Sequence, residues 1–414
     1  MSQAYDGRLG VAFPLRVGKQ VPSAEFDELR RTCVLEHCKW DPQVGDRATL
    51  APFPVFISGA DWAHLAGLAE KLAAETEVAE RELLQRRTLL KQLGLPRALQ
   101  REFARAAEVG EPPSFARVLR FDFHFTREGW RVSEVNSDVP GGYSEAQGFS
   151  SLMAEYFPGH HLTGSPASTW AKGAALALDP AGEIALLSAP GYMEDVQVVA
   201  YLASFLRAQG MKARLVGPRE LRWRSGQAFL AGAQRPLAGV FRFYQLEWLP
   251  ACGQPGWFHF LHGAVTPVSN PARAALSESK RFPLVWRELR TPLTEFARAM
   301  PESCAPREVL GRFDEGWVLK GSYSNCGDAV FSNRWTSAGA LRAAWARALL
   351  APSGWVAQRE FEVAPLETPL GTMTHCLGVY VIDGRAAGAY LRLSPAQFVD
   401  AYAIDTALLV EEGA

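Results

Sequence analysis

The sequence lacks the features that mark several classes of protein. No run of about 20 apolar residues occurs, which excludes a conventional membrane-spanning helix. The 43 Lys and Arg residues balance 44 Asp and Glu residues, so no overall positive field favours nucleic acid or a membrane surface. We therefore expect no nucleic-acid partner and no membrane partner, and any anionic ligand must be held by a local site.

Cysteine is scarce and irregularly placed. The six cysteines share no repeated pair spacing, which is typical of reduced thiols rather than of a disulfide framework or a zinc cluster. Cys33, His37 and Cys38 come nearest to a metal motif, but no second pair follows at zinc-like spacing. The first residues show no positive segment followed by an apolar run, so we expect a cytoplasmic protein.

The sequence has enough apolar residues for two or three packed units, with 48% hydrophobic residues in a chain of 414. Between Asp61 and Leu93, apolar residues at helical spacing predict one or two long amphipathic helices. Ser58 or Asp61 can cap the first helix, and the step Gly94-Leu95-Pro96 ends the pattern.

Later segments alternate between strand and helix patterns. An apolar strand, a helix and a second strand follow one another between Glu183 and Gly217, and another apolar run covers residues 237–243. This order predicts a βαβ unit with parallel strands. Several short strand patterns follow Trp317, and Asp383-Gly384 between the last two is a two-residue hairpin signal.

A hairpin is also predicted earlier in the chain. The run VLRFDFHFTREGWRVSEVNSD alternates apolar and polar residues on both sides of Arg127-Glu128-Gly129. A three-residue loop with Gly in its last position is a common connection, so we expect Thr126 to pair with Trp130. One face of the hairpin is then apolar and suits packing on a core; its residues are Leu119, Phe121, Phe123, Phe125 and Val135.

The other face of this hairpin is polar and looks into solvent or a cleft. The register places Asp122 opposite Glu134, and Arg120 opposite Asn136. Like charges so placed destabilise a sheet unless something positive lies between them, and a divalent cation is the simplest answer. Oxygen-only ligands suit Mg²⁺, and Arg120 suits a phosphoryl or carboxylate oxygen. The alternative is a solvated sheet face with Arg120 in a salt bridge to Asp122 or Glu134.

A longer motif continues from the hairpin. Arg-x-Asp is followed by Glu-x-Asn-x-Asp-x-Pro-Gly-Gly-Tyr-x-Glu, across residues 120–145. This motif resembles the synthetase domain of glutathionylspermidine synthases, which look like circularly permuted members of the ATP-grasp superfamily. In that family the acidic metal ligands precede the nucleotide-binding lysines, and the same order occurs here. No separate amidase domain is expected.

The resemblance implies roles for residues of this motif. Arg120 steadies an acyl-phosphate transition state, and the segment Asp138 to Glu145 lines the pocket of the acyl or amine substrate. Asp138 or Glu145 could bind the amine and take its proton, whereas His124 is expected to form part of the pocket wall. By the same resemblance, the Mg²⁺ ligands are Asp122, Glu134 and Asn136.

The nucleotide side is expected after residue 269. A strand carrying Lys320 leads into a loop with Gly321 and Gly327 at its ends, where backbone N–H groups can turn toward a phosphate. No Gly-Lys-Ser/Thr opens a helix, so this is not a Walker A loop, and such a loop by itself is usually structural. Arg392 either faces phosphate or pairs with an acidic neighbour. The resemblance adds a helix lysine and two strand residues near the nucleotide: Lys280, Gln358 and Glu360.

The predicted fold class is α/β (α+β): an ATP-grasp fold in permuted order with a small Rossmann-like βαβ, or pre-ATP-grasp, domain. We expect a mostly helical region at residues 1–110, the metal- and substrate-binding part at 111–165, the βαβ domain at 166–268 and the nucleotide-binding part at 269–414. One segment between the two halves resembles the family but can equally be structural; it contains Arg242, Tyr244, Glu247 and Trp248.

The expected function is that of an ATP- and Mg²⁺-dependent ligase. It would join a peptide or small-molecule carboxylate to an amine, such as a polyamine or an amino acid, through an acyl-phosphate. The alternatives are a kinase on the same fold and a nucleotide-binding protein without turnover, because fold does not fix function. The sequence does not distinguish among the possible acids and amines, and it does not determine the oligomeric state.

Overall fold

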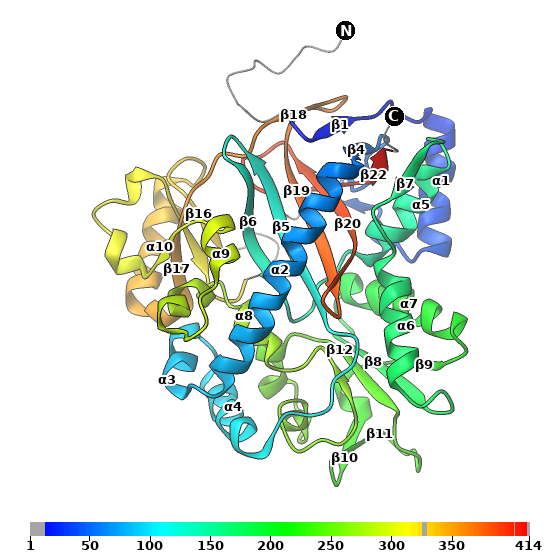
Figure 1. Ribbon diagram of the computed structural model, residues 1–414, viewed down its shortest axis with the longest axis vertical. Helices are drawn as coiled ribbons and strands as arrows, with labels where there is room; N and C mark the ends of the chain where they lie inside the picture. Colours follow the sequence, from blue (N-terminus) through cyan, green and yellow to red (C-terminus); the bar gives the residue numbers. More distant parts are fainter. Residues whose placement is uncertain (1–12, 325–328, 401, 412–414) are drawn as a thin grey trace.

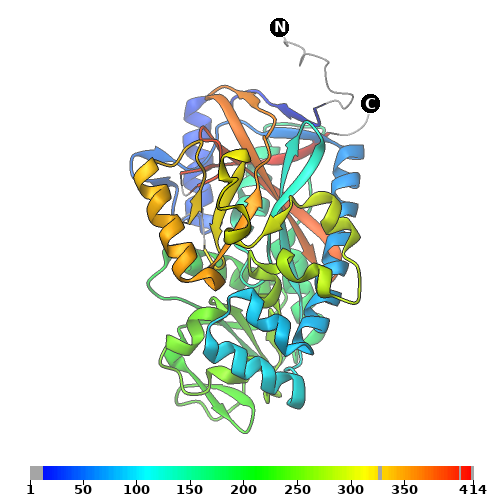
Figure 2. The same ribbon diagram turned by 90° about the vertical axis from the view of Figure 1, so that its left-hand side faces the viewer.

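The computed structural model describes residues 13–324, 329–400 and 402–411. The predicted phosphate-loop residue Gly327 lies outside these described residues. A six-stranded antiparallel sheet lies at the centre, and a four-stranded parallel sheet lies below it in Figures 1 and 2. A four-stranded antiparallel sheet lies to its left in Figure 1, and a further four-stranded sheet lies near the chain ends. Helices and strands are mixed throughout, which confirms the predicted α/β class.

The six-stranded sheet forms the centre of the molecule. Its main path runs β21-β20-β19-β5-β6, and β18 pairs with β19. The turn at Asp383-Gly384 connects β19 to β20, with φ of 47° and 78°, which confirms the predicted hairpin. The strands are β5 (Val118–Thr126), β6 (Gly129–Asn136), β18 (Leu366–Thr368), β19 (Gly371–Ile382), β20 (Arg385–Ser394) and β21 (Ile404–Thr406).

Helix α2 (Gly59–Leu84) crosses the apolar face of this sheet in Figure 1. The Ser58 hydroxyl caps it by accepting from the Asp61 N–H at 3.0 Å. Leu65 and Leu72 of the helix share one core with Phe121 and Phe123 of β5. The predicted long helix, its cap and the apolar sheet face are therefore confirmed. The short helices α3 (Arg87–Leu90) and α4 (Arg97–Val109) follow it.

The predicted parallel βαβ unit is present. The strand order is β13-β12-β8-β9, and every neighbouring pair is parallel. Helix α7 (Met193–Ala208) joins β8 to β9, and helix α6 (Pro166–Ala177) packs beside it. The strands are β8 (Glu183–Ser188), β9 (Lys212–Val216), β12 (Gly239–Phe243) and β13 (Val268–Ser269).

A smaller antiparallel sheet lies beside the central one, in the order β14-β17-β15-β16. Helix α10 (Ala338–Leu350) covers it through a separate core that includes Trp317, Leu319 and Ala348. Helices α8 (Ala274–Glu278) and α9 (Thr294–Ala299) precede this sheet. Its strands are β14 (Ser303–Cys304), β15 (Trp317–Gly321), β16 (Val330–Phe331) and β17 (Trp355–Arg359).

The fourth sheet brings distant parts of the chain together. Its order is β1-β4-β22-β7, so the last strand lies between residues from the first half of the chain. Helices α1 (Ser23–Glu36) and α5 (Ser150–Ala154) pack near it. The strands are β1 (Leu15–Val17), β4 (Val55–Ser58), β7 (His160–Leu162) and β22 (Leu408–Glu411). Two small hairpins complete the described part: β2 (Gln43–Val44) with β3 (Arg47–Ala48), and β10 (Leu221–Arg224) with β11 (Gln227–Leu230).

The hairpin of β5 and β6 has the predicted register where it matters for the polar face. Asp122 lies opposite Glu134, and Arg120 lies opposite Asn136. Both pairs are therefore confirmed as cross-strand neighbours, and all four residues belong to one face of the sheet.

The predicted pairing at the turn is wrong by one residue. Thr126 pairs with Gly129 and Phe125 pairs with Trp130, because the loop comprises two residues instead of three. Gly129 has a φ of 95°, which only glycine adopts readily. A bulge at Ser133 then adds one residue to β6 and restores the expected register beyond it.

None of the helices in the described part of the chain combines the length and the apolar content needed to cross a membrane.

Candidate active site

The polar face of β5 is buried. Arg120, Asp122 and His124 are 6%, 1% and 8% exposed, so this face looks into the interior between the sheets and not into solvent. Burying charge is costly unless each group finds a partner, and the partners here come from several strands. The sequence predicted that this face looks into solvent or into a cleft, and the structure shows that it faces a space lined by protein.

Two arginines hold Asp122. Arg120 donates through Nε to Oδ1 at 2.8 Å and through Nη2 to Oδ2 at 3.1 Å, and Arg392 of β20 donates to Oδ2 at 2.7 Å. Burial alone raises the pKa of Asp122, but the two guanidinium groups outweigh it and hold the pKa well below its usual range. The Arg120–Asp122 salt bridge, kept open as an alternative, is therefore present. Like-charge repulsion does not by itself require a metal here.

Glu134 is held by Lys280, whose Nζ lies 3.2 Å from Oε2. Burial raises the pKa of Glu134, but Lys280, Lys320 and Arg392 together outweigh burial, and the pKa lies below its usual value. The helix predicted for Lys280 is wrong, because α8 ends at Glu278 and Ser279 turns the backbone away with a ψ of 124°. The Lys280 N–H instead donates to the Ser322 carbonyl at 2.9 Å, beside the predicted phosphate loop.

Lys320 approaches the same space from the neighbouring sheet. Its Nζ donates to Gln358 Oε1 at 2.7 Å, across the paired strands β15 and β17. Burial lowers the pKa of Lys320 to about 8, while nearby Glu134 opposes the shift. One cavity is lined by residues that include Glu134, Glu278, Lys280, Lys320 and Gln358.

Glu360 and Gly321 take different positions from these residues. The Glu360 carboxylate accepts from Ser332 Oγ at 3.2 Å and lies 3.1 Å from Arg334 Nε. Gly321 ends β15, and its N–H donates to the Ala329 carbonyl at 2.9 Å. A predicted nucleotide role for these two residues stays a prediction.

Both ring nitrogens of His124 already have partners. Its Nδ1 lies 2.8 Å from the His375 carbonyl, and its Nε2 lies 3.0 Å from Ser133 Oγ. Burial lowers the pKa of His124 to about 4, so the ring is neutral near pH 7. These contacts fit the expected position of His124 in the wall of the site.

The donor set on the polar face fits Mg²⁺. Asp122, Glu134 and Asn136 offer only oxygen to a metal, and Mg²⁺ takes few protein ligands while phosphate and water complete its shell. No group of three or more His, Cys, Asp and Glu side chains in the described ranges could hold a metal, and the predicted set of two carboxylates and one amide is not such a group. The Asn136 Nδ2 is buried and makes no hydrogen bond within the described part of the chain.

Asp138 is fixed in an ion pair that the sequence did not reveal. Arg242 of β12 donates to both carboxylate oxygens, at 3.0 Å to Oδ2, and the Leu246 N–H donates to Oδ2 at 2.8 Å. Both side chains of the ion pair are at most 1% exposed. Asp138 thereby ties the end of β6 to the parallel sheet.

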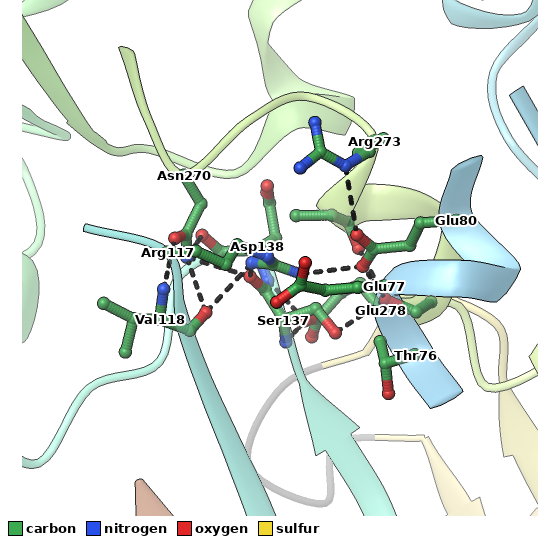
Figure 3. A network of polar contacts seen from close by, with 12 residues as sticks. Thr76, Glu77, Glu80, Arg117, Val118, Ser137, Asp138, Asn270, Arg273 and Glu278 are labelled. Atoms are coloured by element: carbon green, nitrogen blue, oxygen red, sulfur yellow. Dashed lines mark hydrogen bonds and ion pairs between the residues drawn. The ribbon is translucent and has the colours of Figure 1, made fainter. Parts of the chain in front are cut away.

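A wider network holds the segment after β6, as Figure 3 shows. Glu278 Oε2 accepts from the N–H groups of Ser137 and Asp138 at 2.6 and 2.9 Å. Asn270 donates to the carbonyls of Val118, Ser137 and Asp138. Glu278 and Asn270 therefore fix the backbone that leads from the predicted metal face to the predicted substrate segment.

Glu145 is bound by Lys39, from the N-terminal region whose role the sequence left open. Lys39 Nζ donates to Glu145 Oε1 at 2.5 Å and to Asp405 Oδ2 at 3.1 Å. Ser144 Oγ donates to the second oxygen of Glu145 at 3.1 Å. A lone lysine 106 positions before its partner carries no sequence signal, so sequence reasoning missed it.

Gly378 is a second residue that sequence reasoning missed. It lies opposite Asp122 in the sheet, and a Cβ there would come within 2.7 Å of Tyr390 Cε1 and 2.9 Å of Arg120 Cδ. The missing side chain leaves room for Arg120 to lie along the sheet and reach Asp122. An isolated glycine in a strand indicates such a close approach, but not its partner.

The mixed α/β architecture, with its central antiparallel sheet and its parallel sheet, fits an ATP-grasp-type fold. The model of the family described as glutathionylspermidine synthase pre-ATP-grasp matches residues 55–406. The chain belongs to this family, which makes it a synthetase-type ligase. The resemblance that the motif at residues 120–145 indicated is thus confirmed.

A solved structure shows the same fold. A glutathione synthetase-like effector from Globodera pallida, in its apo form, is 13% identical with a TM-score of 0.64, covering 94% of this chain and 98% of that one. A putative gamma-glutamylcysteine synthetase from Methylobacillus flagellatus is 12% identical with a TM-score of 0.41, covering 78% of this chain and 85% of that one. No curated protein sequence matches the chain.

Proposed function

We propose that this protein is an ATP- and Mg²⁺-dependent ligase that joins a carboxylate to an amine through an acyl-phosphate. The observation that carries the proposal is the buried polar face, where two carboxylates and an amide lie among Arg120, Arg392, Lys280 and Lys320. Such a set supplies oxygen ligands for a metal and several cations for phosphates.

Each cation has a proposed place in the reaction. Lys280 and Lys320 hold the nucleotide phosphates, and Arg120 and Arg392 face the carboxylate that is activated. A carboxylate oxygen attacks the γ-phosphorus, and the bond to ADP breaks. The amine nitrogen then attacks the acyl carbon, and phosphate leaves with the electron pair of the C–O bond. Bound Mg²⁺ would spread the charge of the transferring group, and positioning supplies much of the remaining rate.

The incoming ammonium must lose a proton before it attacks. Asp138 and Glu145 were the candidates, but each is already paired, with Arg242 and Lys39 respectively. We assign these two a positioning role. Glu278 lines the cavity, and burial raises its pKa to about 7, so it suits a base near neutral pH.

Turnover of defined substrate pools tests the proposal. Purified protein with ATP and Mg²⁺ should release ADP and phosphate only when pools of acids and of amines are both present. A phosphorylated acceptor would identify a kinase instead, and silence across broad pools would overturn catalysis of either kind.

A matched pair of variants ties this activity to the site. Glu134→Gln should lose turnover, whereas Glu128→Gln should keep it, because Glu128 lies in the turn of the same hairpin with its side chain 74% exposed. Equal activity of the two variants would contradict the assigned metal face.

A further inference from the structure

Lys39 is a buried lysine near the polar face of β5, and the proposed mechanism gives it no part in the reaction. Lys39 follows helix α1, and its N–H donates to the Cys33 carbonyl at 3.1 Å. The next residue, Trp40, donates its N–H to Gln197 Oε1 at 2.9 Å. Cys38 between them and the helix has a φ of 56°. The backbone is thus pinned on both sides of Lys39, and the side chain turns inward until it is 3% exposed.

Three carboxylates surround the single ammonium of Lys39. Glu145, Asp41 and Asp405 lie 2.5, 3.0 and 3.1 Å from Nζ, and they come from three separate segments of the chain. We call these four residues the Lys39 cluster. Nζ donates hydrogen bonds to Glu145 and Asp405, and Asp41 Oδ1 lies within ion-pair distance of it without a hydrogen bond in the described part of the chain.

The Lys39 cluster lies next to the polar face of β5. Asp405 of β21 lies directly opposite Arg392 of β20, and Arg392 donates to Asp122. Because cross-strand partners share a face, the cluster and the polar face of β5 belong to the same side of one sheet. The ring of Tyr390 lies close to both guanidinium groups, 5.5 Å from Arg120 and 5.6 Å from Arg392.

A structural ion pair needs one carboxylate for one ammonium. Placing three carboxylates, one buried and two partly buried, around a single cation leaves an excess of negative charge, which is costly where water is largely excluded. Burial also raises the pKa of Asp405 to about 7, with Glu145 adding to the rise while Lys39 opposes it. Groups crowded against their electrostatic preference are typical of functional sites.

We propose that Lys39 is a built-in cation that fills the subsite where a second ammonium of the acceptor amine would otherwise lie, so that the acceptor carries a single ammonium. This inference rests on the proposed ligase function and decides between the two amine classes that the sequence left open. A monoamine or an amino acid fits beside the occupied subsite, whereas a polyamine meets the charge of Lys39 there.

Amine binding to the Lys39→Ala protein tests this inference without ATP or an acid substrate. The probes are 1-aminobutane and 1,4-diaminobutane, and the readouts are the melting temperature and calorimetric titration. In wild type we expect both amines to bind equally weakly. In the variant a second ammonium can enter the vacated subsite, so the diamine should bind about tenfold or more tightly than the monoamine.

A lysine far from the cluster supplies the control. Lys71→Ala on helix α2 removes an exposed ammonium and should respond to both amines as wild type does. An equal response of Lys39→Ala to the two amines, or a preference for the diamine already in wild type, would overturn the inference. If Lys39→Ala fails to fold alone, folding that returns only with the diamine supports it, and failure with either amine overturns it.

These measurements also separate the inference from the proposed function. If wild type turns over acid and amine pools but Lys39→Ala shows no preference for the diamine, only the proposed role of Lys39 is overturned. If wild type shows no ligase activity in broad pools but Lys39→Ala binds the diamine preferentially, the proposed subsite stands and the proposed reaction is overturned.

Discussion

Two central strands of this protein are buried for opposite reasons. In β8, Ile184 to Leu187 are all apolar and fully buried between the cores on the two faces of the parallel sheet. In β5, every residue is also buried, but Arg120, Asp122 and His124 alternate with apolar neighbours. The hydrophobic effect stabilises β8 on both faces and β5 on one face only.

This difference separates a strand that contributes only stability, β8, from a strand that also contributes charged groups for a ligand, β5. The charged face of β5 stays folded because its charges compensate one another across strands, and that face then offers charge to a ligand. The face of β8 offers none. Substitutions in the two strands should therefore separate turnover from stability, and the following predictions run from the largest expected effect to the smallest.

Asp122→Asn should have the largest effect. Turnover should fall by about a thousandfold or more, because the variant loses a metal ligand and charge compensation together. The free energy of unfolding should also drop by about 3–5 kcal/mol, since buried Arg120 and partly buried Arg392 lose their partner. ADP release and urea unfolding measure the two effects. The exposed Asp46→Asn is the control, and near-normal turnover in Asp122→Asn would overturn the assigned role.

Leu186→Ala in β8 should lower stability without altering the chemistry. Removing a fully buried leucine should cost about 2–5 kcal/mol in the free energy of unfolding, while turnover per folded molecule stays unchanged. Leu176→Ala on helix α6 is the control, because this side chain is 90% exposed and should matter little. If turnover falls by more than the fraction of folded protein does, β8 contributes to the chemistry and the proposed separation of stability from chemistry is wrong.

Gly378→Ala should displace Arg120 in the candidate active site. Its Cβ would meet Tyr390 and Arg120 at less than 3 Å, so Arg120 must move away from Asp122. Turnover should fall by about tenfold to a hundredfold, and overpacking should cost about 1–3 kcal/mol in the free energy of unfolding. Gly67→Ala, where nothing lies within 4 Å, is the control. Unchanged turnover in Gly378→Ala would show that Arg120 needs no such room.

Nucleotide affinity should depend on the proton of Lys320. The lysine is charged below its pKa of about 8, so affinity for a non-hydrolysable ATP analogue should be full below pH 8 and fall by up to about tenfold per pH unit above it. Because the folded chain binds fewer protons at Lys320 than the unfolded chain, this group's contribution to stability rises with pH between about 8 and 10.5.

Lys320→Arg provides the control for this pH dependence. An arginine stays charged throughout the range, so the variant should bind the analogue with little change between pH 7 and pH 9. The same fall in affinity in both proteins would mean that another group is responsible.

The smallest effect is expected at the surface of helix α2. Arg81 and Glu77 form an exposed i,i+4 pair at 2.7 Å. Arg81→Ala should change the free energy of unfolding by no more than about 0.5 kcal/mol and leave turnover unaltered. A larger loss in urea unfolding would show that the back of this helix contributes more to stability than its exposure suggests.

The sequence allowed a detailed prediction wherever local pattern dominates. The long helix from Gly59, the parallel βαβ unit and the Asp383-Gly384 hairpin all follow from spacing and turn chemistry. The pairing of Asp122 with Glu134 was also predictable, although the turn has one residue fewer in its loop. It came out right because the bulge at Ser133 compensates for the shorter loop.

The sequence by itself thus determined the class of elements, the family and the register of the proposed oxygen ligands, because each depends on residues close together in the chain. Only the tertiary structure decided how those ligands are compensated. Arg392, Lys280 and Lys39 reach their carboxylates from positions more than 100 residues away, and burial makes each of these contacts matter. No local pattern encodes such pairs, since their energy arises only when water is excluded from the space between the sheets.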